Sequence, residues 1–184
     1  MARVHTDPEQ LEAVLVTGGL ASGKTSVAIE IGELLEQARI PFAVVDLDWL
    51  CWAWSPSLAA DGVHTLMCDN LRALLPNLRE QGIRRLVLAR AVLSTSGMAQ
   101  LQESVAPTPL RVVRLTATEE HAVARLRARD SGQRLAAHLA RRAAFADLVT
   151  AAAADTPVVD TSDRAAADVA AEIVASLGWA RAGQ

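Results

Sequence analysis

The fold of this chain is decided by residues 18–25, Gly18-Gly19-Leu20-Ala21-Ser22-Gly23-Lys24-Thr25, which match the phosphate-binding pattern G-x-x-x-x-G-K-[ST] at every fixed position. Lys24 is the only lysine, and arginine supplies every other cationic side chain among the 18. A lysine ammonium is a compact charge on a thin stem, whereas a guanidinium needs a wide, flat partner. In such a loop the backbone N–H groups surround a phosphate, and the Thr25 hydroxyl is a ligand for Mg²⁺. We therefore predict that this loop, with Ser26 directly after it, binds the phosphates of a nucleotide.

The flanking sequence contains the strand and the helix that this motif requires. Residues 13–17 form a short, nearly continuous apolar run, which is typical of a parallel strand buried on both faces. From residue 25 to residue 38, apolar side chains recur every three or four positions, the period of an amphipathic helix. A chance glycine-rich turn is the alternative interpretation, but the complete motif, its flanking elements and the lone lysine all disfavour it.

The rest of the chain alternates in the same way. Four further strands are predicted over 42–46, 85–89, 110–115 and 157–160, and helices over 63–81, 97–104, 118–129, 134–153 and 164–177. We expect Pro76 to kink or divide helix 63–81, and we expect helices to start at Thr118 and at Ser162-Asp163. Five strands separated by helices predict an α/β fold in which one parallel sheet is covered on both faces. A chain of 184 residues is long enough to form a single domain.

Composition narrows the class of protein. The two cysteines, Cys51 and Cys68, form no C-x-x-C pair, which favours a reduced, cytoplasmic chain. No stretch approaches the ~20 apolar residues of a membrane span, so we expect no membrane partner. The net charge of −3 gives no overall attraction to a polyanion, and we expect no nucleic-acid partner. The four histidines lack metal-ligand spacing with one another or with the cysteines, so a zinc site is not expected.

Two acids, Asp46 and Asp48, follow the predicted strand 42–46. They are two residues apart and so lie on the same side of an extended chain, at the strand end where ligands bind in parallel sheets. Phosphoryl transfer to an alcohol needs Mg²⁺ and a carboxylate that orients or deprotonates the hydroxyl. We assign Asp48 as the base that orients the substrate and Asp46 as the metal or water contact, and the reverse assignment stays open. A structural role for one of the acids, as a turn cap, is the alternative.

Three of the four tryptophans, Trp49, Trp52 and Trp54, fall directly after the acid pair, although aromatic residues make up only 3% of the chain. A tryptophan offers a large flat surface with one N–H donor, so these side chains are candidates for the wall of an acceptor-binding pocket. The alternative is that they pack in the core beneath a loop.

Arginines follow two of the other predicted elements. Arg125 and Arg129 lie four residues apart and share one face of helix 118–129, before a lid predicted at about 129–136. Two guanidiniums there suit a lid that closes over the nucleotide and stabilises charge on the transferring phosphate. A solvated helix face is the alternative interpretation. Arg90, at the end of strand 85–89, is a candidate for holding substrate or phosphate.

In their order, these features resemble the P-loop small-molecule kinases, which include adenylylsulfate, shikimate and gluconate kinases and chloramphenicol phosphotransferase. The resemblance rests on the motif at 18–25, the acid pair, the arginines at 125–129 and the segment Val158-Val159-Asp160-Thr161-Ser162. It implies a single P-loop kinase-like domain over 1–184 with sheet order 2-3-1-4-5. It also implies ATP and Mg²⁺ as cofactors, with Asp160, Thr161 and Ser162 near the adenine. The chain departs from the family at Ala89-Arg90-Ala91, where an acid or a glycine-rich segment is common.

The resemblance implies an ATP-dependent phosphotransferase that moves the γ-phosphate to a hydroxyl of a small molecule, either a metabolite or an antibiotic, as a monomer or a homodimer. The alternative is a nucleotide-binding regulatory module that transfers no phosphate to a small molecule. The missing acid after strand 85–89 favours this alternative, whereas the acid pair and the tryptophans argue against it. A GTPase is disfavoured, because the guanine motif N-K-x-D would need a second lysine.

Overall fold

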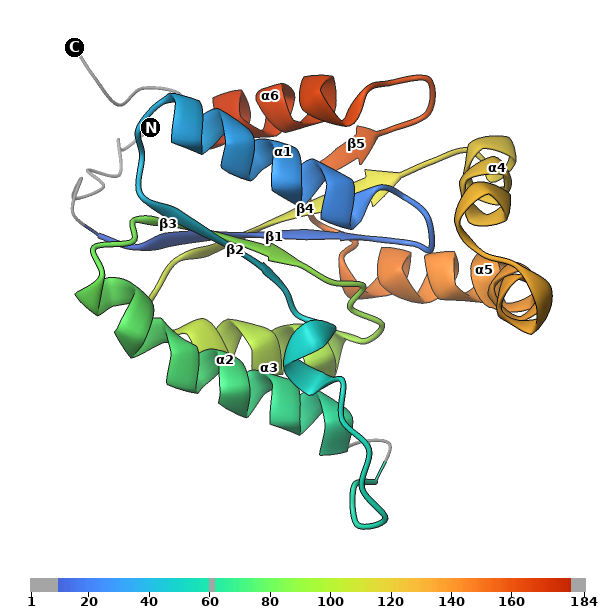
Figure 1. Cartoon of the computed structure of the whole chain (residues 1–184), viewed down its shortest axis with the longest axis horizontal. Coiled ribbons are helices and arrows are strands. Elements are labelled where there is room, and N and C mark those ends of the chain that lie inside the picture. Colours follow the sequence, from blue (N-terminus) through green and yellow to red (C-terminus); the bar gives the residue numbers. More distant parts are fainter. Residues whose placement is uncertain (1–9, 60–61, 180–184) are drawn as a thin grey trace.

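The computed structural model describes residues 10–59 and 62–179, and its centre is a parallel sheet in the order β2-β3-β1-β4-β5 (Figure 1). The strands are β1 (Glu12–Gly18), β2 (Phe42–Asp46), β3 (Arg85–Ala89), β4 (Leu110–Thr116) and β5 (Val158–Asp160). The predicted α/β fold and the sheet order 2-3-1-4-5 are therefore confirmed.

Helices cover both faces of this sheet (Figure 1). The helical elements are α1 (Lys24–Gln37), the short 3₁₀ turn η1 (Trp49–Cys51), α2 (Gly62–Glu80), α3 (Thr95–Val105), α4 (Glu119–Arg129), α5 (Gly132–Ala152) and α6 (Ala166–Leu177). One face packs against α1 and α6, and the other packs against α2, α3 and α5, while α4 lies beyond the carboxyl end of β4. Among the described residues, no helix is both long and apolar enough to cross a lipid bilayer.

The central strand β1 separates two apolar cores, which explains its continuous apolar sequence. Val14 and Val16 pack on the side of α1 and α6, and Leu15 packs with Leu71 and Leu101 on the side of α2 and α3. All five side chains are fully buried, and each such burial contributes roughly 1.5–3 kcal/mol. The sheet register sets Val16 and Asp46 each opposite Ala89, so β1, β2 and β3 end at one edge. The residues that follow these strands therefore come together.

Two details of the helices differ from the prediction. Helix α2 continues through Pro76 as one helix, so the predicted division does not occur, and Leu71 and Leu75 remain buried on its apolar face. Helix α6 begins at Ala166 and not at Ser162-Asp163. The Ser162 hydroxyl instead donates to Asp160 Oδ1 (2.8 Å) and accepts from the backbone N–H of Thr118 (2.9 Å). The predicted start at Thr118 is confirmed, since its side chain accepts from the N–H of His121.

Candidate active site

The phosphate-binding loop joins β1 to α1 and owes its shape to two glycines. At Gly18, a Cβ atom would lie 2.5 Å from Ser22 Oγ and 2.6 Å from the carbonyl oxygen of Leu115, so no side chain fits. Gly23, the residue before α1, has a φ of +92°, which residues with a side chain rarely adopt. The loop is thus held open in front of the N-terminus of α1, where backbone N–H groups and the helix dipole favour an anion.

Lys24 lies folded over this loop. Its Nζ donates to the carbonyl oxygen of Gly19 at 2.8 Å. Burial lowers the pKa of Lys24 to about 8, an effect that the nearby charges of Asp48 and Asp46 only partly oppose. The Lys24 side chain is therefore mostly in its charged form at pH 7. A phosphate oxygen would take the place of the Gly19 carbonyl as the acceptor of its hydrogen bond.

The loop and the acid pair are connected by hydrogen bonds. Thr25 Oγ1 donates to Asp46 Oδ2 at 2.9 Å, and Asp46 Oδ1 accepts from the N–H of Asp48 at 3.1 Å. A hydroxyl and a carboxylate are the hard oxygen ligands that Mg²⁺ prefers, and Mg²⁺ often takes only one or two protein ligands and keeps several waters. Across residues 10–59 and 62–179, no group of three or more His, Cys, Asp or Glu side chains is placed to hold a metal ion. Thr25 and Asp46 accordingly fit a magnesium ion that shares its coordination with phosphate and water.

Arg90 lies beside Asp48, although the two residues follow different strands. Its Nη1 is 3.2 Å from Asp48 Oδ1, and it also donates to the carbonyl oxygen of Leu47 (3.4 Å) and to Cys51 Sγ (3.1 Å). The Arg90 side chain is mostly buried, with 15% exposed, whereas 71% of the Asp48 side chain is exposed. The sequence analysis did not predict this pair, although a charged residue follows each of the two strands that lie side by side.

The three tryptophans lie on the surface. Their exposed fractions are 69% for Trp49, 74% for Trp52 and 86% for Trp54. Trp49 and Trp52 stack on each other, with ring centroids 4.8 Å apart and an interplanar angle of 28°. The alternative that these side chains pack in the core is therefore wrong.

Arg125 supports the phosphate-binding loop from α4. It donates to the carbonyl oxygen of Ala21 (3.3 Å) and to both oxygens of Thr161, Oγ1 at 2.9 Å and the carbonyl at 2.6 Å. Thr161 is buried, and its hydroxyl lies 3.1 Å from the carbonyl oxygen of Ser22. Arg125 and Thr161 thus connect the loop to the end of β5.

Two adjoining cavities lie in front of the loop. The first, of about 210 Å³, is lined by Ala21, Gly23, Lys24, Thr25, Ser26, Arg125 and Arg129. The second, of about 310 Å³, is lined by Gly23, Ser26, Val27, Arg125, Thr161, Arg164, Ala166 and Val169. Arg125 and Arg129 both line the first cavity, which agrees with the prediction that they share one face of the helix.

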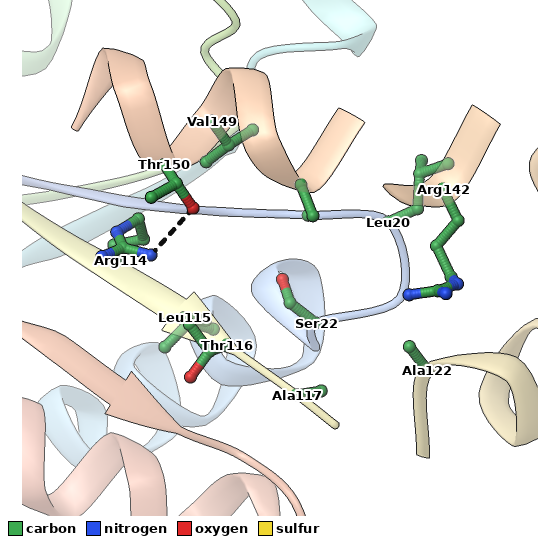
Figure 2. Close-up of a pocket in the computed structure, with 12 residues that line it drawn as sticks. Leu20, Ser22, Arg114, Leu115, Thr116, Ala117, Ala122, Arg142, Val149 and Thr150 are labelled. Carbon is green, nitrogen blue, oxygen red and sulfur yellow. Dashed lines mark hydrogen bonds between the residues drawn. The ribbon is translucent and has the colours of Figure 1, made fainter. Parts of the chain in front are cut away.

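A third cavity, shown in Figure 2, lies behind the loop between β4 and α5 and measures about 80 Å³. Ser22 and Arg114 line it, and Arg114 donates to Thr150 Oγ1 at 3.1 Å. Among the described residues, Ser22 Oγ has no hydrogen-bond partner. The space suits a few water molecules and is too small for a nucleotide, so the front of the loop is the candidate site.

The predicted lid region, 129–136, contains a buried acid. Between α4 and α5 only Asp130 and Ser131 are non-helical, and 2% of the Asp130 side chain is exposed. Its carboxylate accepts from Arg129 Nε and Nη2 (3.2 and 3.0 Å) and His138 Nδ1 (2.7 Å), and lies 3.3 Å from Arg134 Nε. Hydrogen bonds from Arg129 and then His138 lower the pKa of Asp130 to about 2. The sequence analysis did not predict this cluster, although Asp130, Arg134 and His138 follow one another at intervals of four residues.

Asp130→Asn is expected to lower the thermal unfolding midpoint at pH 7 by several degrees, because an amide cannot balance the positive charges around it. The pKa of Asp130 is lowered from 3.8 to about 2 in the folded protein, so its contribution to stability is complete above about pH 4. That contribution is lost as the pH falls towards 2, where wild type and variant should melt together. Circular-dichroism melts across this range measure the difference.

Asp163→Asn is the matched control, since Asp163 Oδ1 also accepts from a histidine, His121 Nε2 at 2.8 Å, but its side chain is 85% exposed. Exposed pairs contribute little, so this variant should melt like wild type. Equal midpoints for Asp130→Asn and wild type at pH 7 would show that the buried cluster does not stabilise the fold.

Comparison with known proteins gives structural matches only. No family model and no curated protein sequence matches this chain. A sugar kinase from Janibacter sp. HTCC2649 matches with a TM-score of 0.62 and 16% identity, over 91% of this chain and 95% of that one. A gluconokinase from Sinorhizobium meliloti 1021 matches with a TM-score of 0.60 and 22% identity, over 91% and 92%. The APS kinase of Mycobacterium tuberculosis, in complex with AMPPNP and APS, matches with a TM-score of 0.60 and 21% identity, over 93% and 99%. This chain therefore has the fold of the P-loop small-molecule kinases.

Proposed function

We propose that this protein is an ATP-dependent phosphotransferase that moves the γ-phosphate of ATP to a hydroxyl group of a small molecule. One observation carries the proposal: Thr25 of the loop is hydrogen-bonded to Asp46, and Asp46 is hydrogen-bonded to the backbone of Asp48. This contact joins a phosphate site to an exposed carboxylate, which is the arrangement that transfer to an alcohol requires. The similar fold of several small-molecule kinases also supports phosphotransfer.

The nucleotide would occupy the two cavities in front of the loop. The loop amides and Lys24 would hold the phosphates in the cavity that Arg125 and Arg129 also line. The adenine would lie in the adjoining cavity between Arg125 and Arg164, beside Thr161. Mg²⁺, held by Thr25 and Asp46, would neutralise charge on the phosphate oxygens.

Asp48 would act on the acceptor. Its carboxylate is the exposed member of the acid pair, which supports a role in taking the proton of the acceptor hydroxyl. The acceptor oxygen then bonds to the γ-phosphorus while the bond from that phosphorus to the β,γ-bridging oxygen breaks, and ADP leaves. Arg125 and Arg129 would screen the negative charge that spreads over the transferring group.

We assign the enzyme to the cytoplasm as a monomer or homodimer, without a nucleic-acid or membrane partner.

A regulatory module is the competing function, because β3 ends in Ala89 and Arg90 without an acid. Asp46 of β2 contacts the loop threonine and would supply the carboxylate that β3 lacks. ADP formation from ATP·Mg separates the two functions when it is measured with and without each member of a library of small-molecule alcohols. Acceptor-dependent ADP supports the kinase, and an unchanged rate with every compound supports the regulatory module.

ATP binding is expected to take up about half a proton at pH 8 and to be about tenfold weaker at pH 9 than at pH 7. The pKa of Lys24 is about 8 without ligand, so the competent ammonium form is half populated at pH 8 and scarce at pH 9. Titration calorimetry in two buffers of different ionisation enthalpy measures the uptake. Lys24→Arg is the control, because its guanidinium stays charged and should take up no proton. Equal uptake by both proteins would assign the proton to another group.

A further inference from the structure

The tryptophan cluster (Trp49, Trp52 and Trp54) is unusual in its exposure. The remaining tryptophan, Trp179, is 2% exposed, and its Nε1 donates to Glu12 Oε2 at 2.7 Å. A folded chain ordinarily covers such large side chains, and a contiguous exposed apolar patch marks a contact surface. The outer faces of the stacked pair Trp49 and Trp52 are therefore available to a ligand.

The tryptophan cluster directly follows Asp48, the acid assigned to the acceptor, and buried side chains and hydrogen bonds fix the turn η1 that contains Trp49. Leu47, just before η1, and Cys51, its last residue, are both buried, and the N–H of Leu50 donates to the carbonyl oxygen of Leu47 (3.2 Å). Asn70 Nδ2 on α2 donates to the carbonyl oxygen of Leu50 at 2.6 Å. Trp49 thus belongs to a fixed turn that directly follows Asp48, and Trp52 stacks on it.

The charges on this side oppose an anionic ligand. Arg90 is balanced by Asp48 at 3.2 Å, and Arg72 on α2 is balanced by Asp69 at 2.7 Å. The pKa of His64 is lowered, first by burial and then by the nearby Arg90, so His64 is neutral at pH 7. A carboxylate or phosphate on the acceptor would meet the exposed Asp48, because Arg90 and Arg72 are already paired and Lys24, the other cation near Asp48, is assigned to the phosphates of ATP.

We propose that the acceptor is an uncharged alcohol carrying an aromatic ring, which packs against the stacked Trp49 and Trp52 while its hydroxyl lies at Asp48. This inference rests on the proposed phosphotransfer and names its substrate class. Tryptophan binds a flat ring through offset stacking and apolar contact, and neither interaction requires charge. Because an acidic group is disfavoured by Asp48, the site distinguishes a neutral compound from its anionic counterpart.

The test is ADP formation with three matched groups of compounds. Aryl glycosides and nucleosides are neutral and aromatic, and alkyl glycosides lack the aromatic ring. Aryl glucuronides and nucleoside monophosphates keep the aromatic ring and add an anionic group. At least one neutral aromatic compound should be phosphorylated, with kcat/KM about tenfold or more above the values for its non-aromatic and anionic counterparts. Trp49→Ala and Trp52→Ala should each raise the KM for that compound about tenfold and leave the KM for ATP within about twofold. Leu148→Ala, which removes another exposed apolar side chain, on α5, should change neither.

Failure of the two proposals would look different. The acceptor class is overturned, while phosphotransfer stands, under either of two outcomes. Non-aromatic or anionic alcohols are phosphorylated just as efficiently as neutral aromatic ones, or the tryptophan variants keep the wild-type KM for the acceptor. If ATP binds and no compound of any class raises ADP formation, phosphotransfer itself is overturned, and the acceptor assignment with it.

Discussion

Lys24→Ala is expected to abolish turnover and to leave the fold intact. The ammonium is the one lysine charge at the loop, and removing a group that stabilises charge in the transition state costs about 10³-fold or more in kcat. The fold should survive because the lowered pKa of Lys24 shows that the folded protein does not favour its charged form. Steady-state ADP formation and circular-dichroism melts of both proteins measure the two effects.

Lys24→Arg again provides the control, since it keeps the charge and changes its shape. We expect it to remain folded, to keep binding ATP and to recover little turnover, because a planar guanidinium cannot bring its charge to the transferring phosphate as a compact ammonium does. Near-normal turnover of Lys24→Ala would remove Lys24 from the mechanism, whereas loss of both activity and folding would make it a structural residue.

Asp48→Asn is expected to lower kcat by about 10²–10⁴-fold and to change ATP affinity little. An amide cannot accept the hydroxyl proton, but Asp48 does not contact the loop hydroxyl that we assign to Mg²⁺. Asp46→Asn is the matched comparison on the same strand end, and it should weaken ATP·Mg binding as well as turnover. Full kinetics at varied ATP and acceptor concentrations separate the two patterns.

The assignment of the two acids is tested by the same data. If Asp48→Asn loses kcat and ATP affinity equally, Asp48 has a metal or folding role. If the two variants show exchanged patterns, the base is Asp46 and the metal contact is Asp48.

The sequence predicted the elements whose signals are local. The loop motif between an apolar strand and an amphipathic helix located β1 and α1, and Thr118 marked the start of α4 through its own side-chain cap. Pro76 misled because its local effect is opposed by the burial of Leu71 and Leu75, which only the tertiary structure shows.

Contacts between distant residues were harder to predict. Arg90 and Asp48 meet because β2 and β3 are neighbours in register, and no spacing along the chain shows this. Asp130 read as part of a lid loop, yet it is buried among Arg129, Arg134 and His138. The exposure of the tryptophans was also open, because tryptophan occurs both in cores and at binding surfaces.

Phosphotransfer is tested most directly by following the γ-phosphate itself. The protein is incubated with [γ-³²P]ATP, Mg²⁺ and the small-alcohol library, and the label is then traced among ATP, inorganic phosphate and organic phosphoesters. We expect label in an organic phosphoester with wild type, none with Lys24→Ala, and about one hundredth of the wild-type rate or less with Asp48→Asn. Label that remains in bound ATP, or that appears only as inorganic phosphate across the library, would contradict it.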